Sequence, residues 1–482
     1  MNGSSSCFDS SGFSGFAASK YGALAACACI VIVDVALYWK SLGLYFIQDD
    51  FWYLWITSDQ SFRGLMELFT TQNVFYRPIS NFLYFFSLQM IFGTNPFPYH
   101  LANLLIHVFN SLAVGYLVYL LTENRPMAFA SAIIFTSRVG HVTAVYWICV
   151  TTQSMPLMFF LLSLILYVHH HRSGRPGLLI ASYASFALCA FSNINGPSLA
   201  VLFTAYDVIV RRDRSLWSIV RREAGFYATV ALFLFLQFIV FEYGPTDDYT
   251  VSIGALALKI FGILNVYAFN SLYMLGHLGV SRSIMATAGM WAGFAVISTA
   301  LVVFIIAGRQ GSKQEGNLHL FFGMWYVWGF VPYLPLTEHV WPQYITTAAV
   351  GLAFISAALL TRFFRAKGLA AALCMILTIS FFSIRVFEKE EYEKKGIMYK
   401  SELGRHVIAD LKGHIERQPR VERIIILDGR TELWWILHYG RNAEIFVDRY
   451  RPIFYPVSAD GFVSDSSSLV LRFEGMRLYK VQ

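Results

Sequence analysis

Charged residues are scarce in this 482-residue chain. Asp, Glu, Lys and Arg make up 14% of it, whereas a soluble domain typically carries about 25%. None of the six cysteines forms a CxxC pair, and most of them lie inside apolar runs. We interpret them as small buried apolar residues. These shortages argue against an ordinary soluble protein and against a cysteine-based metal or redox centre.

Hydrophobic residues take the place of the missing charge and make up 56% of the chain. Many apolar runs approach the roughly 20 residues that a helix needs to span a bilayer. The runs are continuous rather than alternating, so helices are predicted and a β-barrel is not. About eleven spans are expected, at residues 20–41, 97–122, 126–139, 153–170, 177–192, 196–211, 224–243, 284–307, 318–336, 342–362 and 368–386.

The net charge of +7 reflects membrane topology, because Lys and Arg cluster in short loops between the apolar runs. No nucleic-acid partner is therefore predicted. The loops at 169–175, 211–222, 309–313 and 362–367 fall on one side, which the positive-inside rule makes the cytoplasm. We expect a cytoplasmic N-terminal tail at residues 1–19, a transmembrane domain at 20–386, and a C-terminus in the periplasm of a bacterial inner membrane.

Three further segments differ in composition from the spans. Residues 64–93 and 250–276 carry polar side chains among aromatics, which predicts amphipathic helices at the outer interface. Residues 387–482 follow a charged exit from the membrane and predict a small periplasmic α/β domain. Within it, 423–429 has the pattern of a buried strand ending in a turn, and 468–481 that of a hairpin.

Two adjacent acids, Asp49 and Asp50, lie just past the first apolar run, in the sequence Tyr45-Phe-Ile-Gln-Asp-Asp-Phe-Trp. Unpaired acids beside the hydrocarbon edge are costly, which indicates a function. The alternative is that they only cap an interfacial helix beginning at Phe51. His100 and His107, on an apolar helix, are more simply interpreted as core histidines than as metal ligands.

Downstream of the acid pair come Tyr76-Arg-Pro and a stretch running from Gly93 through Pro98-Tyr-His100 to His107 and Asn110. With the acid pair, this pattern resembles the GT-C superfamily of membrane glycosyltransferases. It is most similar to bacterial proteins related to protein O-mannosyltransferases and to transmembrane-TPR mannosyltransferases. The resemblance covers roughly residues 20–210 and returns weakly at 332–356.

The resemblance implies a general base at Asp49, with Asp50 second, that takes a proton from an acceptor hydroxyl. A positioned carboxylate contributes about 10²–10⁴-fold to such a step. The donor is then a polyprenyl-phosphate sugar, and cations should face its phosphate. Arg77 is the first candidate, although it is also explained as an interfacial anchor. The further candidates for the donor phosphate are Arg138, His141, Arg282 and His339.

Several residues that are charged in the family pattern are neutral here, at Thr143, Thr151, Gln153, Asn193 and Gln343. Two hypotheses follow. Either the donor or acceptor differs, or the chain is an inactive GT-C-like subunit of a larger membrane or cell-surface complex. A transporter is disfavoured because most spans contain few charged residues.

The expected partners are the polyprenyl-phosphate-sugar lipid, membrane lipids and, under the second hypothesis, proteins on the periplasmic face. No cofactor is predicted with certainty. A divalent metal at the acid pair stays an alternative, because two carboxylates supply only part of a site for a hard cation. The sequence does not name the sugar or the acceptor.

Overall fold

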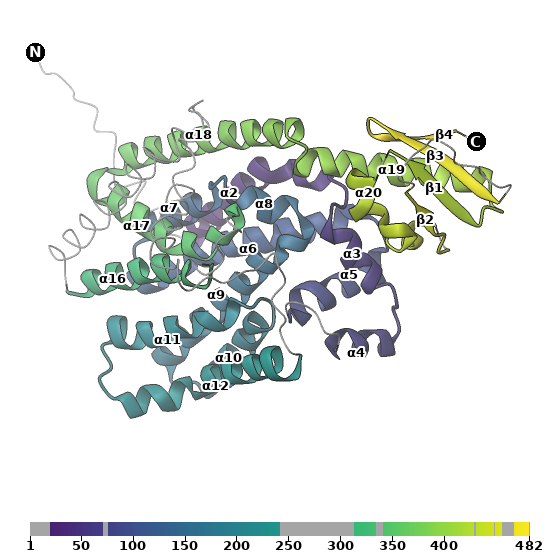
Figure 1. Ribbon diagram of the computed structural model, residues 1–482. Helices are drawn as coiled ribbons and strands as arrows, with labels where there is room; N and C mark the ends of the chain where they lie inside the picture. The colour runs from purple at the N-terminus through teal and green to yellow at the C-terminus, as the bar shows by residue number, and fades with distance from the viewer. Residues whose placement is uncertain are drawn as a thin grey trace, which may run out of the picture.

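A computed structural model describes residues 20–70, 76–241, 313–333, 341–428, 430–447, 449–455 and 467–481. These residues form a body of packed helices with a small sheet at one end (Figure 1). Three long helices run through the body or along its surface: α6 (Pro96–Thr122), α9 (Thr151–Ser173) and α18 (Ala366–Glu393). The α-helices of the body are α2 (Lys20–Tyr38), α3 (Asp49–Ile56), α4 (Phe62–Thr70), α5 (Tyr84–Phe92), α6 (Pro96–Thr122), α7 (Arg125–Thr136), α8 (His141–Tyr146), α9 (Thr151–Ser173), α10 (Pro176–Ala190), α11 (Val201–Ala205), α12 (Leu216–Phe235), α16 (Lys313–Trp328), α17 (Ala348–Phe363) and α18 (Ala366–Glu393).

Short 3₁₀ and π segments connect or extend these helices. The 3₁₀ segments are η1 (Trp39–Gly43), η3 (Ile148–Val150), η4 (Gly196–Ala200), η10 (Val331–Tyr333) and η11 (Pro342–Ile345). The π segments are η2 (Pro78–Leu83), η5 (Tyr206–Arg211) and η6 (Leu236–Val240).

In the part of the chain that the structure describes, five helices are long and apolar enough to cross a membrane, so the prediction of an integral membrane protein with several apolar helices is supported. They cover Tyr21–Gly43, Pro96–Thr122, Ile148–Ser173, Leu216–Val240 and Ala366–Glu393. The predicted number of about eleven spans is not confirmed in the described residues. The apolar helices at Pro176–Ala190 and Ala348–Phe363 are shorter than the roughly 20 residues that span a bilayer, and the predicted span at 284–307 lies outside the described residues.

Capping and close backbone contact explain the hairpin of α6 and α7. The Asn95 side chain accepts a hydrogen bond from the backbone N–H of Phe97 (3.2 Å), which starts α6. The Asn124 side chain does the same for Met127 at the start of α7 (3.0 Å). A Cβ on Gly115 would lie 3.1 Å from that of Ala132. Gly115 therefore lets the two helices pack at short range.

The predicted α/β unit is present as a four-stranded sheet with strand order β2-β1-β3-β4. Strand β1 pairs in parallel with β2 and β3, and β3 forms an antiparallel hairpin with β4. The strand predicted at 423–429 and the hairpin at 468–481 are thus confirmed. The elements are α19 (Ile397–Arg417), β1 (Arg423–Leu427), α20 (Arg430–Leu437), η12 (His438–Gly440), α21 (Glu444–Val447), β2 (Ile453–Phe454), β3 (Ser468–Glu474) and β4 (Arg477–Lys480).

The α/β unit is packed firmly onto the loop that carries the acid pair. Buried Phe46 and Phe51 share one hydrophobic cluster with Leu403 and Phe446 of the C-terminal unit. A Cβ on Gly404 of α19 would lie 2.9 Å from the carbonyl oxygen of Phe46. Such contact requires a residue without a side chain at this position. The two parts therefore form a shared core rather than a domain on a free linker.

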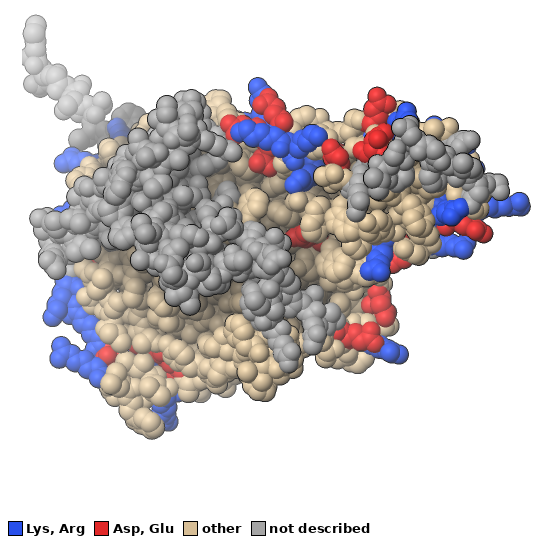
Figure 2. All heavy atoms as spheres, viewed as in Figure 1, with Lys and Arg blue, Asp and Glu red and all other residues tan. Residues whose placement is uncertain are grey.

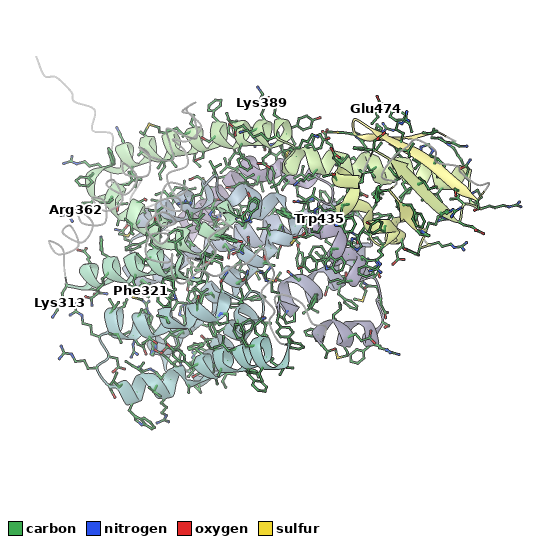
Figure 3. The ribbon with its side chains drawn as sticks, in the orientation of Figure 1. Lys313, Phe321, Arg362, Lys389, Trp435 and Glu474 are labelled. Carbon is green, nitrogen blue, oxygen red and sulfur yellow. The ribbon has the colours of Figure 1, made fainter. Side chains whose placement is uncertain are left out.

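Charge is distributed differently at the two ends of the molecule. Lys313 and Arg362 lie at one end, and Trp435 and Glu474 of the α/β unit lie at the other (Figure 3). Lys and Arg side chains also gather at the left edge of the space-filling view, and a mixed group of basic and acidic side chains lies along its upper middle (Figure 2). We call these the basic end and the sheet end.

Candidate functional site

Asp50 is a fully buried carboxylate in the first turn of α3. Its Oδ2 accepts a hydrogen bond from the backbone N–H of Ile47 (3.0 Å), and its Oδ1 accepts one from that of Cys149 (2.8 Å). Burial raises the pKa of Asp50 well above its ordinary value, against the lowering effect of these two bonds. Asp50 thus joins the segment before α3 to η3. The helix-capping alternative is wrong for Asp50, because α3 begins at Asp49 without a side-chain capping bond and Asp50 bonds Ile47 and Cys149 instead.

Asp49 has a different environment, although it is the neighbouring residue. Its side chain is half-buried, and the Cys149 thiol lies 3.8 Å from its Oδ2. Burial raises the pKa of Asp49, while the Cys149 hydrogen bond and the positive charges of Arg77 and Lys400 lower it. A carboxylate whose pKa is moved upward, towards neutral pH, is better suited to accept a proton.

Arg77 lies where the sequence predicts a cation beside the acids. It directly precedes Pro78, the first residue of the π-helical segment η2. Its positive charge acts on Asp49 and also on the hydroxyl of Tyr333. The structure therefore brings Asp49 and Arg77 into one site and adds Tyr333 to it.

Lys400 is a second cation near Asp49 that sequence reasoning missed. It lies on α19 of the C-terminal unit, half-buried, and its charge interacts with Asp49 and Glu391. The adjacent Ser401 Oγ accepts a hydrogen bond from the backbone N–H of Tyr45 (2.7 Å), which fixes this part of α19 on the acid-pair loop. No local sequence pattern could reveal Lys400, because its position near Asp49 depends on how the C-terminal unit packs onto the acid-pair loop.

Arg138 and His141 have other neighbours. The Tyr38 hydroxyl donates to the Arg138 carbonyl oxygen (2.9 Å), and the Arg138 side chain interacts electrostatically with Tyr38 and Tyr326. The His141 ring lies 4.8 Å from that of His107, centroid to centroid. These two candidates are thus buried among α2, α6 and α7, whereas Arg77 acts on Asp49. Arg282 and His339 lie outside the described residues.

A buried acid inside the first span is a further group that the sequence reasoning missed. Asp34 of α2 is fully buried, and its Oδ1 lies 3.3 Å from His107 Nε2. Thr136 donates a hydrogen bond to the same Asp34 oxygen. His107 is therefore a core histidine with an acidic partner. The signal was present in the sequence, since an ionisable residue within an apolar run indicates a buried polar contact.

The neutral positions noted in the sequence form hydrogen bonds near the start of α9. Tyr333 donates to Gln153 Oε1 (2.5 Å), and Asn193 Nδ2 donates to the backbone oxygen of Thr152 (2.6 Å). The Thr151 hydroxyl donates to Asn103 Oδ1. Neutral partners thus satisfy Thr151, Gln153 and Asn193 without burying an unpaired charge, whereas the buried Oε1 of Gln343 has no hydrogen-bond partner among the described residues.

A small pocket of about 10 Å³, room for about one water molecule, lies between the start of α9, the 193–199 segment and the end of α16. Gln153, Asn193, Asn195 and Tyr333 contribute to its lining. Within the described ranges, no three His, Cys, Asp or Glu side chains are grouped as a metal site would require. The site therefore consists of one half-buried acid, two nearby cations and an adjoining neutral pocket.

Comparison with known proteins identifies the fold. No family model and no curated protein matches the chain. The apo structure of ArnT from Cupriavidus metallidurans matches with a TM-score of 0.51 and 13% identity, over 93% of this chain and 87% of that one. The archaeal oligosaccharyltransferase AglB from Archaeoglobus fulgidus, in complex with an inhibitory peptide and a dolichol-phosphate, matches with a TM-score of 0.50 and 12% identity, over 90% of this chain and 64% of that one. Both are GT-C glycosyltransferases, so the chain has the fold predicted from its motifs.

Proposed function

We propose that this chain is a membrane glycosyltransferase that moves a sugar from a polyprenyl-phosphate donor to a periplasmic acceptor, with Asp49 as the general base. The observation that carries the proposal is a half-buried acid, Asp49, whose pKa is raised by burial and on which the positive charge of Arg77 acts. The fold supports it, because the AglB structure of the same fold holds a dolichol-phosphate. The O-mannosyltransferase-like subtype remains part of the proposal.

In this mechanism Asp49 takes the proton of the acceptor hydroxyl as that oxygen attacks the anomeric carbon of the sugar. The bond between this carbon and the phosphate oxygen breaks, and the lipid phosphate leaves with the electron pair. Arg77 stabilises the negative charge on the leaving phosphate, since charge-assisted hydrogen bonds to phosphate are strong. Asp50 positions the loop through its bonds to Ile47 and Cys149.

The proposed topology places the basic end in the cytoplasm and the sheet end, with Asp49 and residues 387–482, in the periplasm. Basic loops at one end support it through the positive-inside rule. We expect protease added to intact spheroplasts to cleave within 387–482. Cleavage that occurs only after the membrane is ruptured would reverse the orientation.

The transferase proposal is tested by incubating membranes that contain the chain with undecaprenyl-phosphate sugars and measuring the release of undecaprenyl phosphate. This readout does not require the acceptor to be known, because the membranes supply it. We expect release with the wild-type chain and none above background with Asp49→Asn. Equal release by both would exclude Asp49 as the base.

A non-catalytic role in a larger complex is the second candidate. The neutral side chains at Gln153 and Asn193, where the family pattern has charge, favour it. It predicts no release from any donor, and a partner protein that co-purifies in equal amounts. Release of undecaprenyl phosphate would rule it out.

A further inference from the structure

Gln237 is a buried polar residue at the end of an apolar helix, in the π-helical segment η6 that follows α12. It is fully buried, whereas residues 238–240 are each at least 45% exposed. The π turn is closed by the N–H of Phe241, which donates to the carbonyl oxygen of Leu236 (3.0 Å), five residues back. Turns of this type are rare and frequently mark functional sites. A polar side chain buried in a helix long and apolar enough to cross a membrane is costly and likewise indicates a function.

The Gln237 side chain fixes the backbone immediately before Arg77. Its Oε1 accepts a hydrogen bond from the backbone N–H of Tyr76 (2.8 Å), and this buried bond joins residues that are 161 positions apart. The Tyr76 ring stacks on that of Phe241, with a centroid distance of 4.5 Å and an interplanar angle of 22°. The segment η6 and the residue that follows it therefore fix Tyr76 through both its backbone and its ring.

The residues after Arg77 are fixed by the end of α10. The backbone N–H of Ile79 donates to the carbonyl oxygen of Phe191 (3.2 Å). The Ser80 hydroxyl donates to the carbonyl oxygen of Ser192. Arg77 thus lies between two anchored stretches of backbone, which defines where its side chain starts. A binding group is effective when its supporting residues fix its position before the ligand arrives.

Stability alone does not explain why a glutamine occupies position 237. Its Nε2 is buried and has no hydrogen-bond partner among the described residues. A buried donor without a partner is unfavourable and offsets part of what the bond to Tyr76 contributes. The clearer result of this side chain is the position that it gives to the backbone of Tyr76 and Arg77.

We infer that Gln237 is a positioning residue of the donor site and acts through Arg77. The inference rests on the proposed function, in which Arg77 binds the lipid phosphate. A hydrogen bond between a guanidinium and a phosphate depends on distance and direction. Loss of the bond to Tyr76 loosens the backbone that carries the guanidinium, so it weakens phosphate binding without changing the charge of the site.

The test is a double-mutant cycle on the binding of undecaprenyl phosphate to the purified full chain, with Gln237→Leu, Arg77→Ala and the double variant. Leucine is similar in size to glutamine and cannot accept the bond from Tyr76. We expect Gln237→Leu to weaken binding about fivefold, the scale of one neutral hydrogen bond. When residue 77 is already alanine, the same change should alter binding by less than about twofold, because the two residues act as one unit.

Two results overturn the inference and leave the proposed function in place. One is an equal loss of binding from Gln237→Leu in both backgrounds, since Gln237 would then act independently of Arg77. The other is a Gln237→Leu protein that binds like the wild type while Arg77→Ala binds weakly. A normal affinity in Arg77→Ala would instead refute the proposed role of Arg77 in the donor site, and the inference with it.

Ser163→Ala is the matched control for a purely structural effect. It also removes a buried hydrogen bond from a side chain to a backbone group, because the Ser163 hydroxyl of α9 donates to the carbonyl oxygen of Ser182 in α10 (2.7 Å). We expect it to lower the thermal unfolding midpoint without weakening lipid binding. Gln237→Met repeats the cycle with an unbranched side chain, so the test is complete even if Gln237→Leu does not fold.

Discussion

Two carboxylates at opposite ends of the helical body are held in contrasting ways. At the basic end Asp207 is fully buried, and its Oδ2 accepts from Tyr167 (2.9 Å) and from Arg222 Nη2 (2.8 Å). Its Oδ1 accepts from Arg211 Nη1 (3.1 Å) and lies 3.3 Å from His171 Nε2. At the sheet end Asp49 is half-buried and makes a long contact to a thiol.

The difference separates an acid that stabilises the fold from an acid that can exchange a proton. A carboxylate surrounded by direct cationic partners stays ionised, and removal of one member leaves a buried charge unpaired. A carboxylate whose cations act from farther away can be protonated and deprotonated at lower cost. We therefore expect changes at Asp207 to affect stability and changes at Asp49 to affect catalysis.

The largest expected effect is the loss of transfer in Asp49→Asn, by about 10²–10⁴-fold or to background, with the unfolding midpoint unchanged. The amide has the same shape but is a far weaker base. Asp59→Asn is the control, because Asp59 is an exposed acid in the same loop region. Undecaprenyl-phosphate release measures both variants. A comparable loss in Asp59→Asn would remove the distinction on which the site depends.

The next effect is the destabilisation of the basic end by Asp207→Asn. We expect a loss of about 3–5 kcal/mol, because Arg211 and Arg222 lose the charge that they share. Asp213→Asn should cost less, since Asp213 is partly exposed and Arg222 is its one cationic partner at short range in the described residues (2.5 Å). Unfolding of the two variants in detergent compares them. An unchanged unfolding midpoint in Asp207→Asn contradicts the structural role.

A smaller effect is expected at Arg77, where the change should act on the donor. Arg77→Ala should weaken binding of undecaprenyl phosphate about tenfold or more, the scale of a hydrogen bond to a charged group. Arg77→Lys should recover part of the binding, because lysine restores the positive charge but cannot form the bidentate hydrogen bonds of a guanidinium. Equal binding by wild type and Arg77→Ala would mean that Arg77 is an interfacial anchor.

The smallest expected effect is a shift in the pH dependence of the transfer activity. The charged or titratable groups that act on Asp49 are Asp50, Arg77, Cys149 and Lys400. The positive charge of Lys400 lowers the pKa of Asp49, so Lys400→Ala should raise it. Activity requires the deprotonated acid and is lost as pH falls through this pKa.

The acidic limb of the pH–rate profile of Lys400→Ala should therefore move to higher pH, while Lys400→Arg should leave it in place. Rates of undecaprenyl-phosphate release across a pH series give both profiles. A shift to lower pH, or none, would show that Lys400 does not act on the base.

The sequence predicted the fold where local patterns determine it. The apolar length of 97–122 and its Asn95 cap define α6, and the hairpin at 468–481 follows from strand and turn preferences. Lengths were less predictable for the shorter helices. The run at 196–211 divides into η4, α11 and η5, a change of helix type that the apolar run does not reveal.

The site was predictable in part. Adjacent acids and the Tyr-Arg-Pro motif pointed to Asp49 and Arg77, which the structure places in one site. The contributions of Lys400 and Tyr333 depend on the packing of distant segments and leave no local pattern. The burial of Glu388 was equally hard to predict from the sequence. It belongs to a charged run, yet it is buried and forms ion pairs with Lys40 (2.8 Å) and Arg385 (2.5 Å).

The most direct test of the central claim is an experimental structure of the chain with undecaprenyl phosphate bound. We predict phosphate oxygens at about 2.7–2.9 Å from the Arg77 guanidinium, as in other charge-assisted hydrogen bonds, with the Asp49 carboxylate facing the same space. A phosphate bound away from Arg77, or a sheet end covered by a partner protein with no lipid in it, would contradict the account.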